Sequence, residues 1–181
     1  GGAAGLAIGA RCGRMTGRVR KTAEERKSEI VETALRLADK VGPERLTTDS
    51  VAAAVGVTQA AIFRHFPKKQ DLWEAVAHRI GEKYRVRWAE AETAPGSLAQ
   101  VRRLVDGQLR LVEATPAIPA ILFSRELHSR NQALRRVFAE LMRQFHGRIL
   151  RSLEAAQLEG ERQWSVHPDA QRRAGTRWGQ Y

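Results

Sequence analysis

Apolar side chains recur at helical spacing in the segment from residue 22 to residue 41. Thr22 and Glu25 lie three residues apart, which is the spacing of a capping box, and they predict the start of a helix. Gly42 and Pro43 break the pattern and predict its end. One face of this predicted helix is apolar and comprises Ile30, Ala34, Leu37 and Val41.

Two shorter helical patterns follow and meet at a glycine. Thr48 is predicted as the N-cap of the first, and Gly56 ends it where a left-handed residue is needed. Thr58 is predicted as the N-cap of the second, which spans residues 59–66 and is stopped by Pro67. The arrangement predicts a helix-turn-helix unit, which the preceding helix completes as a three-helix domain. The alternative is an ordinary helical hairpin inside a bundle.

The side chains of this unit separate into an inner and an outer set. The predicted inner seam comprises Val51, Val55, Val57, Ile62 and Phe66. The predicted outer set on the second helix comprises Gln59, Ala60, Ala61, Phe63, Arg64 and His65. A helix of about eight residues is about 12 Å long, and the DNA major groove is about 12 Å wide. The second helix therefore fits a DNA duplex.

Further amphipathic patterns predict an all-α fold for the rest of the chain. One begins near Lys69 and fades before residues 95–96, and the next spans residues 97–114. Pro116 and Pro119 are predicted to frame a loop.

The last strong helical pattern is predicted to be capped by Asn131 and ended by Gly160. Its apolar stripe comprises Leu134, Phe138, Leu141, Phe145 and Ile149. Residues 161–181 hold too few large apolar side chains for a stripe that faces a core. We expect one short helix there at most.

Composition adds to this picture mainly at the N-terminus. The formal net charge of +11 is spread along the chain, so by itself it is weak evidence for a nucleic-acid partner. Residues 1–20 are rich in Gly, Ala and Arg and are predicted to be disordered, because they cannot bury enough apolar surface. They are either a basic arm that contacts DNA phosphates or a solvated tail.

Several classes of protein are not supported by the sequence. Cys12 is the single cysteine, which rules out an intrachain disulfide and suits a reducing compartment. No apolar run approaches the roughly 20 residues of a membrane helix, so we expect a cytoplasmic protein. No nucleophile elbow, phosphate loop or paired carboxylates indicate an enzyme, and no cofactor is expected. Glu126 and His128 would point apart on a helix, which argues against a metal site.

Residues 22–76 resemble the DNA-binding domain of TetR-type bacterial transcriptional regulators without a gap. The resemblance is carried by Val41-Gly42, Leu46-Thr47-Thr48, Val51-Ala52, Gly56-Val57-Thr58, Ile62-Phe63-Arg64-His65-Phe66-Pro67, and Lys69 before Leu72. It implies an all-α fold in which a three-helix DNA-binding domain is joined by a long helix to a C-terminal helical domain for ligand binding and dimerisation. The implied divisions are a disordered basic arm (1–20), the helix-turn-helix domain (21–67), the regulatory domain with the connecting helix (68–160) and an atypical tail (161–181).

The resemblance also implies a set of DNA-binding residues by position. They are Thr48, Thr58, Gln59, Ala60, Ala61, Phe63, Arg64, His65 and Lys69. We expect Gln59 to contact an adenine and Arg64 a guanine, because these side chains match the base edges with two hydrogen bonds. The alternative for Arg64 is a phosphate contact.

Other members of this set match positions that hold the DNA backbone. These are Thr48, His65 and Lys69, for which the alternatives are a helix cap, a partly buried imidazole and a solvated lysine. Phe63 departs from the tyrosine that the family commonly has, so one hydroxyl contact to a phosphate is missing. Asp49 brings a negative charge near the DNA backbone unless the helix N-terminus absorbs it.

The function implied by the resemblance is that of a sequence-specific transcriptional regulator, most simply a repressor. It would bind a pseudo-palindromic operator in double-stranded DNA as a homodimer and be released by a small-molecule effector. Candidate residues for an effector pocket are Trp88, Gln108, Phe123, Glu126, His128, Phe138 and His146, with ordinary core or surface roles as the alternative.

The C-terminal end departs from the family. TetR-type regulators usually continue with two long apolar helices that build the dimer interface, whereas residues 161–181 look truncated or altered. Dimerisation is the property that this departure puts in question. Two alternatives stay open: a regulator remnant that binds DNA weakly as a monomer, or a helical small-molecule-binding protein without operator specificity.

Overall fold

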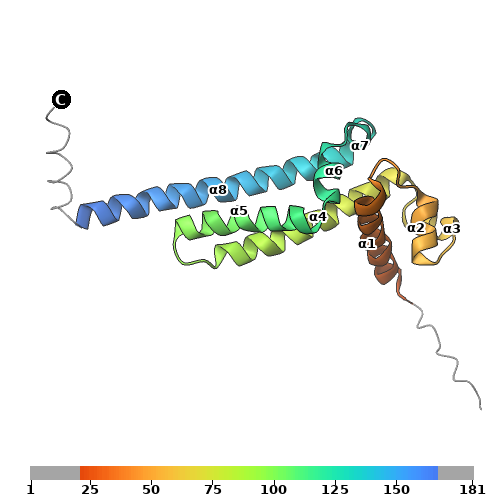
Figure 1. Ribbon diagram of the computed structural model, residues 1–181, viewed down its shortest axis with the longest axis horizontal. Helices are drawn as coiled ribbons and strands as arrows, with labels where there is room; N and C mark the ends of the chain where they lie inside the picture. Colours follow the sequence, from red (N-terminus) through yellow and green to blue (C-terminus); the bar gives the residue numbers. More distant parts are fainter. Residues whose placement is uncertain (1–20, 167–181) are drawn as a thin grey trace, which may run out of the picture.

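The computed structural model describes residues 21–166, with side chains described up to residue 160. Within this range the chain forms eight helices and no strand, which confirms the predicted all-α fold (Figure 1). The helices are α1 (Ala23–Val41), α2 (Thr48–Val55), α3 (Gln59–His65), α4 (Lys69–Glu92), α5 (Ser97–Ala114), α6 (Ala117–Phe123), α7 (Arg125–Arg130) and α8 (Gln132–Val166). The predictions for residues 1–20 and for the end of the tail lie outside the described residues.

The first three helices pack around one apolar centre. Ile30 of α1, Val51 of α2 and Ile62 of α3 are completely buried there. The predicted capping box at the start of α1 is confirmed: Thr22 N–H donates to Glu25 Oε2 at 2.7 Å, and Glu25 N–H donates to Thr22 Oγ1 at 3.2 Å. This local signal fixes where α1 begins, and the buried side chains hold α1 against α2 and α3.

Helix α4 belongs to both parts of the molecule. It packs against α1 at one end and against α5 and α8 over the rest of its length, as Figure 1 shows. Its buried side chains include Leu72, Trp73, Val76, Ile80, Tyr84 and Trp88. One continuous buried cluster consequently runs from the three-helix domain into the body.

Helices α4, α5 and α8 form an elongated body (Figure 1). Trp88 is buried in it, with its ring stacked on Tyr84 (centroids 5.9 Å apart) and on Phe145 (6.1 Å). At the far end, Ser97 donates its backbone N–H and its hydroxyl to the Glu159 carboxylate at 3.2 and 2.7 Å. These contacts fix α5 antiparallel to α8.

Two predictions for the C-terminal half are wrong. Pro116 and Pro119 do not frame a loop, because α6 occupies residues 117–123 and Pro119 lies in its first turn, where a backbone N–H has no partner inside the helix. Helix α8 does not end at Gly160 but continues to Val166. A glycine inside a helix costs about 1 kcal/mol relative to alanine, which weakens a helix without stopping it.

Polar contacts tie the α6–α8 corner to the three-helix domain. The predicted cap at Asn131 is confirmed: its Oδ1 accepts from Leu134 N–H at 2.9 Å, while its Nδ2 donates to the Gln70 carbonyl of α4 at 3.0 Å. On the other side of the corner, Ala117 N–H donates to the Asp39 carboxylate at the end of α1. The start of α6 and the start of α8 are thus both anchored to elements next to the helix-turn-helix unit.

Glu32 of α1 is held between two cations of α4. Arg79 Nε donates to Glu32 Oε1, and Lys83 Nζ lies 3.4 Å from the same oxygen. Partial burial alone raises the pKa of Glu32, but the hydrogen bond from Arg79 and the charge of Lys83 outweigh it and leave the pKa below its ordinary value. The ionised carboxylate therefore stabilises the α1–α4 contact.

We predict that Glu32→Gln lowers the free energy of unfolding at pH 7 by about 1 kcal/mol or less, since the group is partly exposed. The pKa of Glu32 is lower in the folded chain than in the unfolded chain, where it is about 4.3. The stabilisation by the ionised Glu32 carboxylate is therefore complete above the unfolded pKa, and it is lost as the pH falls through the folded pKa. Urea unfolding at pH 7 and pH 3 measures the difference. Glu24→Gln is the control, because Glu24 is largely exposed and pairs only with Lys27. An equal Glu32→Gln effect at both pH values would contradict this account.

Candidate nucleic-acid interface

Helix α2 begins one residue earlier than predicted. The N-cap is Thr47 and not Thr48: Thr47 Oγ1 accepts from Ser50 N–H at 3.1 Å, and Ser50 Oγ accepts from Thr47 N–H at 3.2 Å. Leu46, completely buried immediately before, fixes where the chain turns into the helix. Thr48 is thereby the first helical residue, half-buried. Asp49 lies in the first turn, where the positive helix end stabilises its charge.

The corner between α2 and α3 is built on a left-handed glycine, as predicted. Gly56 has φ 75° and ψ 41°, and its N–H donates to the Ala52 carbonyl at 2.9 Å. Val57 N–H reaches the same carbonyl at 3.0 Å, which closes the helix end. Thr58 is the N-cap of α3, with its Oγ1 accepting from Ala61 N–H at 3.3 Å.

Helix α3 has seven residues and is shorter than predicted, because Phe66 is its C-cap and not its last helical residue. Its length is about 10 Å at 1.5 Å per residue. Ile62 is completely buried and Phe66 nearly so, which holds one side of α3 against α1 and α2. The opposite side must then face away from the core.

The predicted outer set does lie on that opposite side. Gln59, Ala60, Phe63 and Arg64 are exposed, and Ala61 and His65 are half-buried. Phe63 is a large apolar side chain with 40% of its surface exposed. Within the described part of the chain, no side-chain hydrogen bond or ion pair engages Arg64, so its guanidinium is available to a ligand.

Gln59 joins the start of α3 to the start of α2. Its Nε2 donates to Thr48 Oγ1 at 3.1 Å. Two residues proposed for DNA contact thus lie side by side in the free protein, and each already has a hydrogen-bond partner.

A second cluster of cations follows α3. Lys69 is the first residue of α4 and is half-buried, while Lys68 before it is exposed. Lys68 is not among the residues predicted from the sequence, although its position next to Lys69 and after Pro67 is a signal that identifies it. The N-terminus of α4 and these lysines form a positive region beside the C-terminal end of α3.

The residues predicted to line an effector pocket occupy different environments. Trp88 and Phe138 are buried, whereas Phe123 is 77% exposed on α6. His128 contacts the Phe138 ring with centroids 5.8 Å apart, and His146 lines a groove on α8.

Between residues 21 and 160, where side chains are described, no three His, Cys, Asp or Glu side chains are grouped to hold a metal ion. In the same part of the chain, no helix combines the length and apolar character that crossing a bilayer requires.

Comparison with known proteins supports the geometry. Residues 30–76 match the family model for bacterial regulatory proteins of the tetR family. The fold is similar to that of a transcriptional regulator from Saccharomonospora viridis in complex with choline, with a TM-score of 0.69 at 23% identity, over 76% of this chain and 72% of the other. The domain that contains residues 30–76 is of the TetR type.

Two further proteins are similar to this chain. A tetR-family transcriptional regulator from Streptomyces coelicolor has a TM-score of 0.63 at 21% identity, over 74% of this chain and 60% of that one. The nucleoid occlusion factor SlmA of Glaesserella parasuis is 24% identical over 157 residues, which are 86% of this chain and 77% of the relative. The matched family model spans residues 30–76, which include all of α2 and α3.

We predict that Gly56→Ala lowers the free energy of unfolding by about 1–2 kcal/mol, because alanine is strained in the left-handed region. Gly160→Ala is the matched control with the opposite sign: Gly160 is helical, and a Cβ built there meets no atom of the described residues within 4 Å. It should stabilise the chain by up to about 1 kcal/mol. Urea unfolding measures both. If Gly56→Ala lowers the free energy of unfolding by no more than 0.3 kcal/mol, roughly the error of additivity, then residue 56 does not have the left-handed conformation described.

Proposed function

We propose that this TetR-type chain is a transcriptional repressor that reads a pseudo-palindromic operator with the α3 helices of two copies. The observation that carries the proposal is the outer face of α3, which the core holds outward within a matched TetR-type domain. Recognition helices of such a dimer lie about 34 Å apart, one turn of DNA. We also propose the division into a DNA-binding domain (21–67) and a regulatory domain (68–160).

The proposed contacts divide between bases and phosphates. Arg64 is assigned to a guanine and Gln59 to an adenine, and Gln59 would exchange its hydrogen bond to Thr48 for the base edge. Ala60 and Ala61 leave room for α3 to approach the groove floor, and Phe63 offers an apolar surface to a thymine methyl or a sugar.

The phosphate contacts are assigned to the rim of this surface. Thr48, Thr58 and Lys69 lie at the N-terminal ends of α2, α3 and α4, where free backbone N–H groups favour an anion. His65 is the last residue of α3, and its imidazole N–H can donate to a phosphate. Lys68 adds a further cation. Such contacts fix the register of the protein on DNA without reading sequence.

We predict that Arg64→Ala and Lys69→Ala weaken DNA binding in different ways. Arg64→Ala should cost about 1–3 kcal/mol on the selected operator and relax the preference at one base position. Lys69→Ala should weaken all sequences alike and reduce the slope of log affinity against log salt by about one. In vitro selection of sites, followed by titrations at several salt concentrations, measures both effects.

Arg125→Ala is the control for net charge, because Arg125 is exposed at the start of α7, away from α3. It should change neither the preference nor the salt slope. Equal losses for Arg64→Ala on operator and random DNA would overturn its assignment to a base.

The effector is proposed to bind beside the aromatic stack in the body. Trp88 Nε1 and Gln108 Oε1 are buried and lack a hydrogen-bond partner among the described residues. The Arg148 guanidinium lies 4.7 Å from the centroid of the Trp88 ring, which is the position that a bound cation takes over an aromatic face. The similar Saccharomonospora viridis regulator was solved with choline, a quaternary ammonium. A small organic cation that displaces Arg148 is the effector these features support.

We predict that millimolar choline or tetramethylammonium weakens operator binding, whereas 3,3-dimethyl-1-butanol, the uncharged analogue of choline, does not. Trp88→Leu should abolish the response, because the ring that attracts the cation is gone. Fluorescence anisotropy of a labelled operator measures the affinity. An identical response to the cation and to the neutral alcohol would contradict a cation site.

The names of the curated relatives favour a second candidate. They are nucleoid occlusion factors, and a DNA-binding role in that process needs the same α3 surface. Two results together would favour this candidate over an effector-released repressor. In vitro selection would yield a DNA site, and no small molecule would change the affinity for that site.

A further inference from the structure

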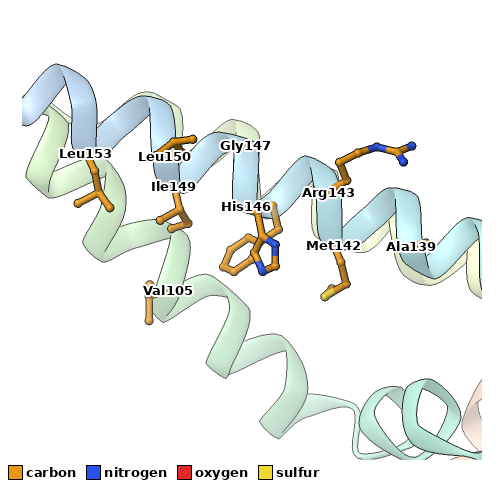
Figure 2. Close-up of a pocket in the computed structure, with 10 residues that line it drawn as sticks. Val105, Ala139, Met142, Arg143, His146, Gly147, Ile149, Leu150 and Leu153 are labelled. Carbon is orange, nitrogen blue, oxygen red and sulfur yellow. The ribbon is translucent and has the colours of Figure 1, made fainter.

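A small pocket lies where the start of α4 meets α7, and its volume is about 150 Å³. The side chains that line it include Lys69 and Trp73 of α4 and Glu126, Leu127 and Arg130 of α7. The larger groove between α5 and α8 differs in kind, because apolar side chains such as Met142, Ile149 and Leu153 dominate its lining (Figure 2). The smaller one, which we call the α4–α7 pocket, combines charged, polar and apolar groups.

Trp73 brings a buried donor without an acceptor to the α4–α7 pocket. The side chain is 2% exposed, and its Nε1 has no hydrogen-bond partner among the described residues. In native structures the large majority of buried polar groups have a partner, so the exception needs an explanation. The buried cluster to which Trp73 belongs is apolar, and the pocket is therefore the place from which an acceptor can come.

Two cations line the same pocket. Lys69 is half-buried and Arg130 is exposed, and no hydrogen bond or ion pair engages either charge among the side chains that the structure describes. The N-terminus of α4, a helix of 24 residues, adds the partial positive charge of its free N–H groups. Two cations, a helix N-terminus and an indole N–H together match a carboxylate, which accepts hydrogen bonds through both oxygens.

Glu126 indicates that the ligand also carries a positive charge. Its side chain is exposed and lines the pocket, but the carboxylate pairs with neither Lys69 nor Arg130. A simple anion would be repelled by this carboxylate, whereas a ligand with an additional ammonium group would be attracted to it. The charges of the pocket therefore favour a zwitterion.

Leu127 and the ring of Trp73 give the pocket an apolar wall. The volume of about 150 Å³ corresponds to about five water molecules at roughly 30 Å³ each. A compact ligand with a short aliphatic side chain fits this space and this wall.

We propose that the α4–α7 pocket binds a small aliphatic α-amino acid. Its carboxylate lies between Lys69, Arg130 and the N–H of Trp73, and its ammonium group pairs with Glu126. The site is distinct from the aromatic stack that is proposed for the effector, because Trp73 and Trp88 are separated by about 22 Å along α4 at 1.5 Å per residue.

Lys69 links this pocket to DNA, and in this respect the inference rests on the proposed function. Lys69 is assigned there to a phosphate, so a bound carboxylate competes with that phosphate for one ammonium group. Asn131, which joins α8 to Gln70, lines the pocket as well. Occupancy of the pocket therefore weakens DNA binding on all sequences alike and lowers the salt slope by about one.

Titration of the isotope-labelled full chain with L-valine, followed at the indole N–H resonances, tests the pocket without DNA. The resonance of Trp73, identified by its loss in Trp73→Phe, should move downfield as the N–H gains an acceptor, and that of Trp88 should not. We expect a dissociation constant of about 1 mM or below for a ligand of this size. No shift of the Trp73 resonance at about 10 mM L-valine would overturn the site.

Two analogues test the two charges of the ligand. The compound 3-methylbutanoate lacks the ammonium group of L-valine, and 2-methylpropylamine lacks its carboxylate. Each should bind about 10-fold more weakly than L-valine, because each loses a charge-assisted hydrogen bond. Equal affinity for all three compounds would contradict a zwitterion site.

Two substitutions in α7 separate the two ends of the ligand. Arg130→Gln should weaken L-valine binding about 10-fold, because it removes a partner of the carboxylate. Arg125→Gln is its control, since Arg125 is exposed on the same helix but does not line the pocket. Equal effects of these two substitutions would count against the assignment of Arg130.

Glu126→Gln should act in opposite directions on two ligands. It should weaken L-valine about 10-fold and strengthen 3-methylbutanoate, because the charge that attracts the ammonium group also repels a simple anion. A variant that loses both ligands would overturn the pairing of Glu126 with the ammonium group. Thermal unfolding reports whether each variant is folded.

DNA titrations separate this inference from the proposed function. Saturating L-valine should lower the salt slope of the wild-type chain by about one, and it should leave the slope of Lys69→Ala unchanged. L-valine that binds without changing DNA affinity would overturn the competition at Lys69 and leave operator reading intact. A chain that selects no DNA site would overturn the proposed function, and the titration without DNA would still decide whether the pocket binds an amino acid.

Discussion

Burial of Ile62 is the constraint on which the rest of the molecule depends. Ile62 and Phe66 fix one side of α3 under α1 and α2, and the left-handed Gly56 sets the direction in which α3 leaves the corner. A helix of seven residues cannot hold itself in water, because helix nucleation is unfavourable. Its outer face, with Arg64, is therefore displayed only because its inner face is packed.

Helix α4 carries this constraint into the body. Its buried side chains belong to the same cluster as Ile62, so one packed core connects α4 to α3. The Glu32 ion pair with Arg79 and Lys83 holds α1 to α4, and Asn131 holds the start of α8 to Gln70. An effector among Tyr84, Trp88 and Arg148 would act on the same helix. Packed cores change between discrete arrangements and do not deform continuously, which suits such a coupling.

Much of this architecture could be predicted because its signals are local. The capping box at Thr22 and the amide cap at Asn131 act within three residues, and the glycine corner at Gly56 is set by one residue.

The predictions were wrong where tertiary contacts decide the local structure. Thr47 and Thr48 can both cap a helix, and burial of Leu46 selects the first. Pro119 resembles a loop signal but is harmless in a first turn that Ala117 anchors to Asp39, 78 residues away. The apolar pattern predicted which residues of α3 face outward, but it did not predict the hydrogen bond between Gln59 and Thr48.

We propose that the outer face of α3 is the part of the chain that meets DNA. Titration of the isotope-labelled protein with duplex DNA, followed by backbone amide chemical shifts, tests this most directly. We expect the largest chemical-shift changes between residues 58 and 69, with smaller ones at the start of α2. Changes concentrated on α5 and α8, with α3 unaffected, would contradict it.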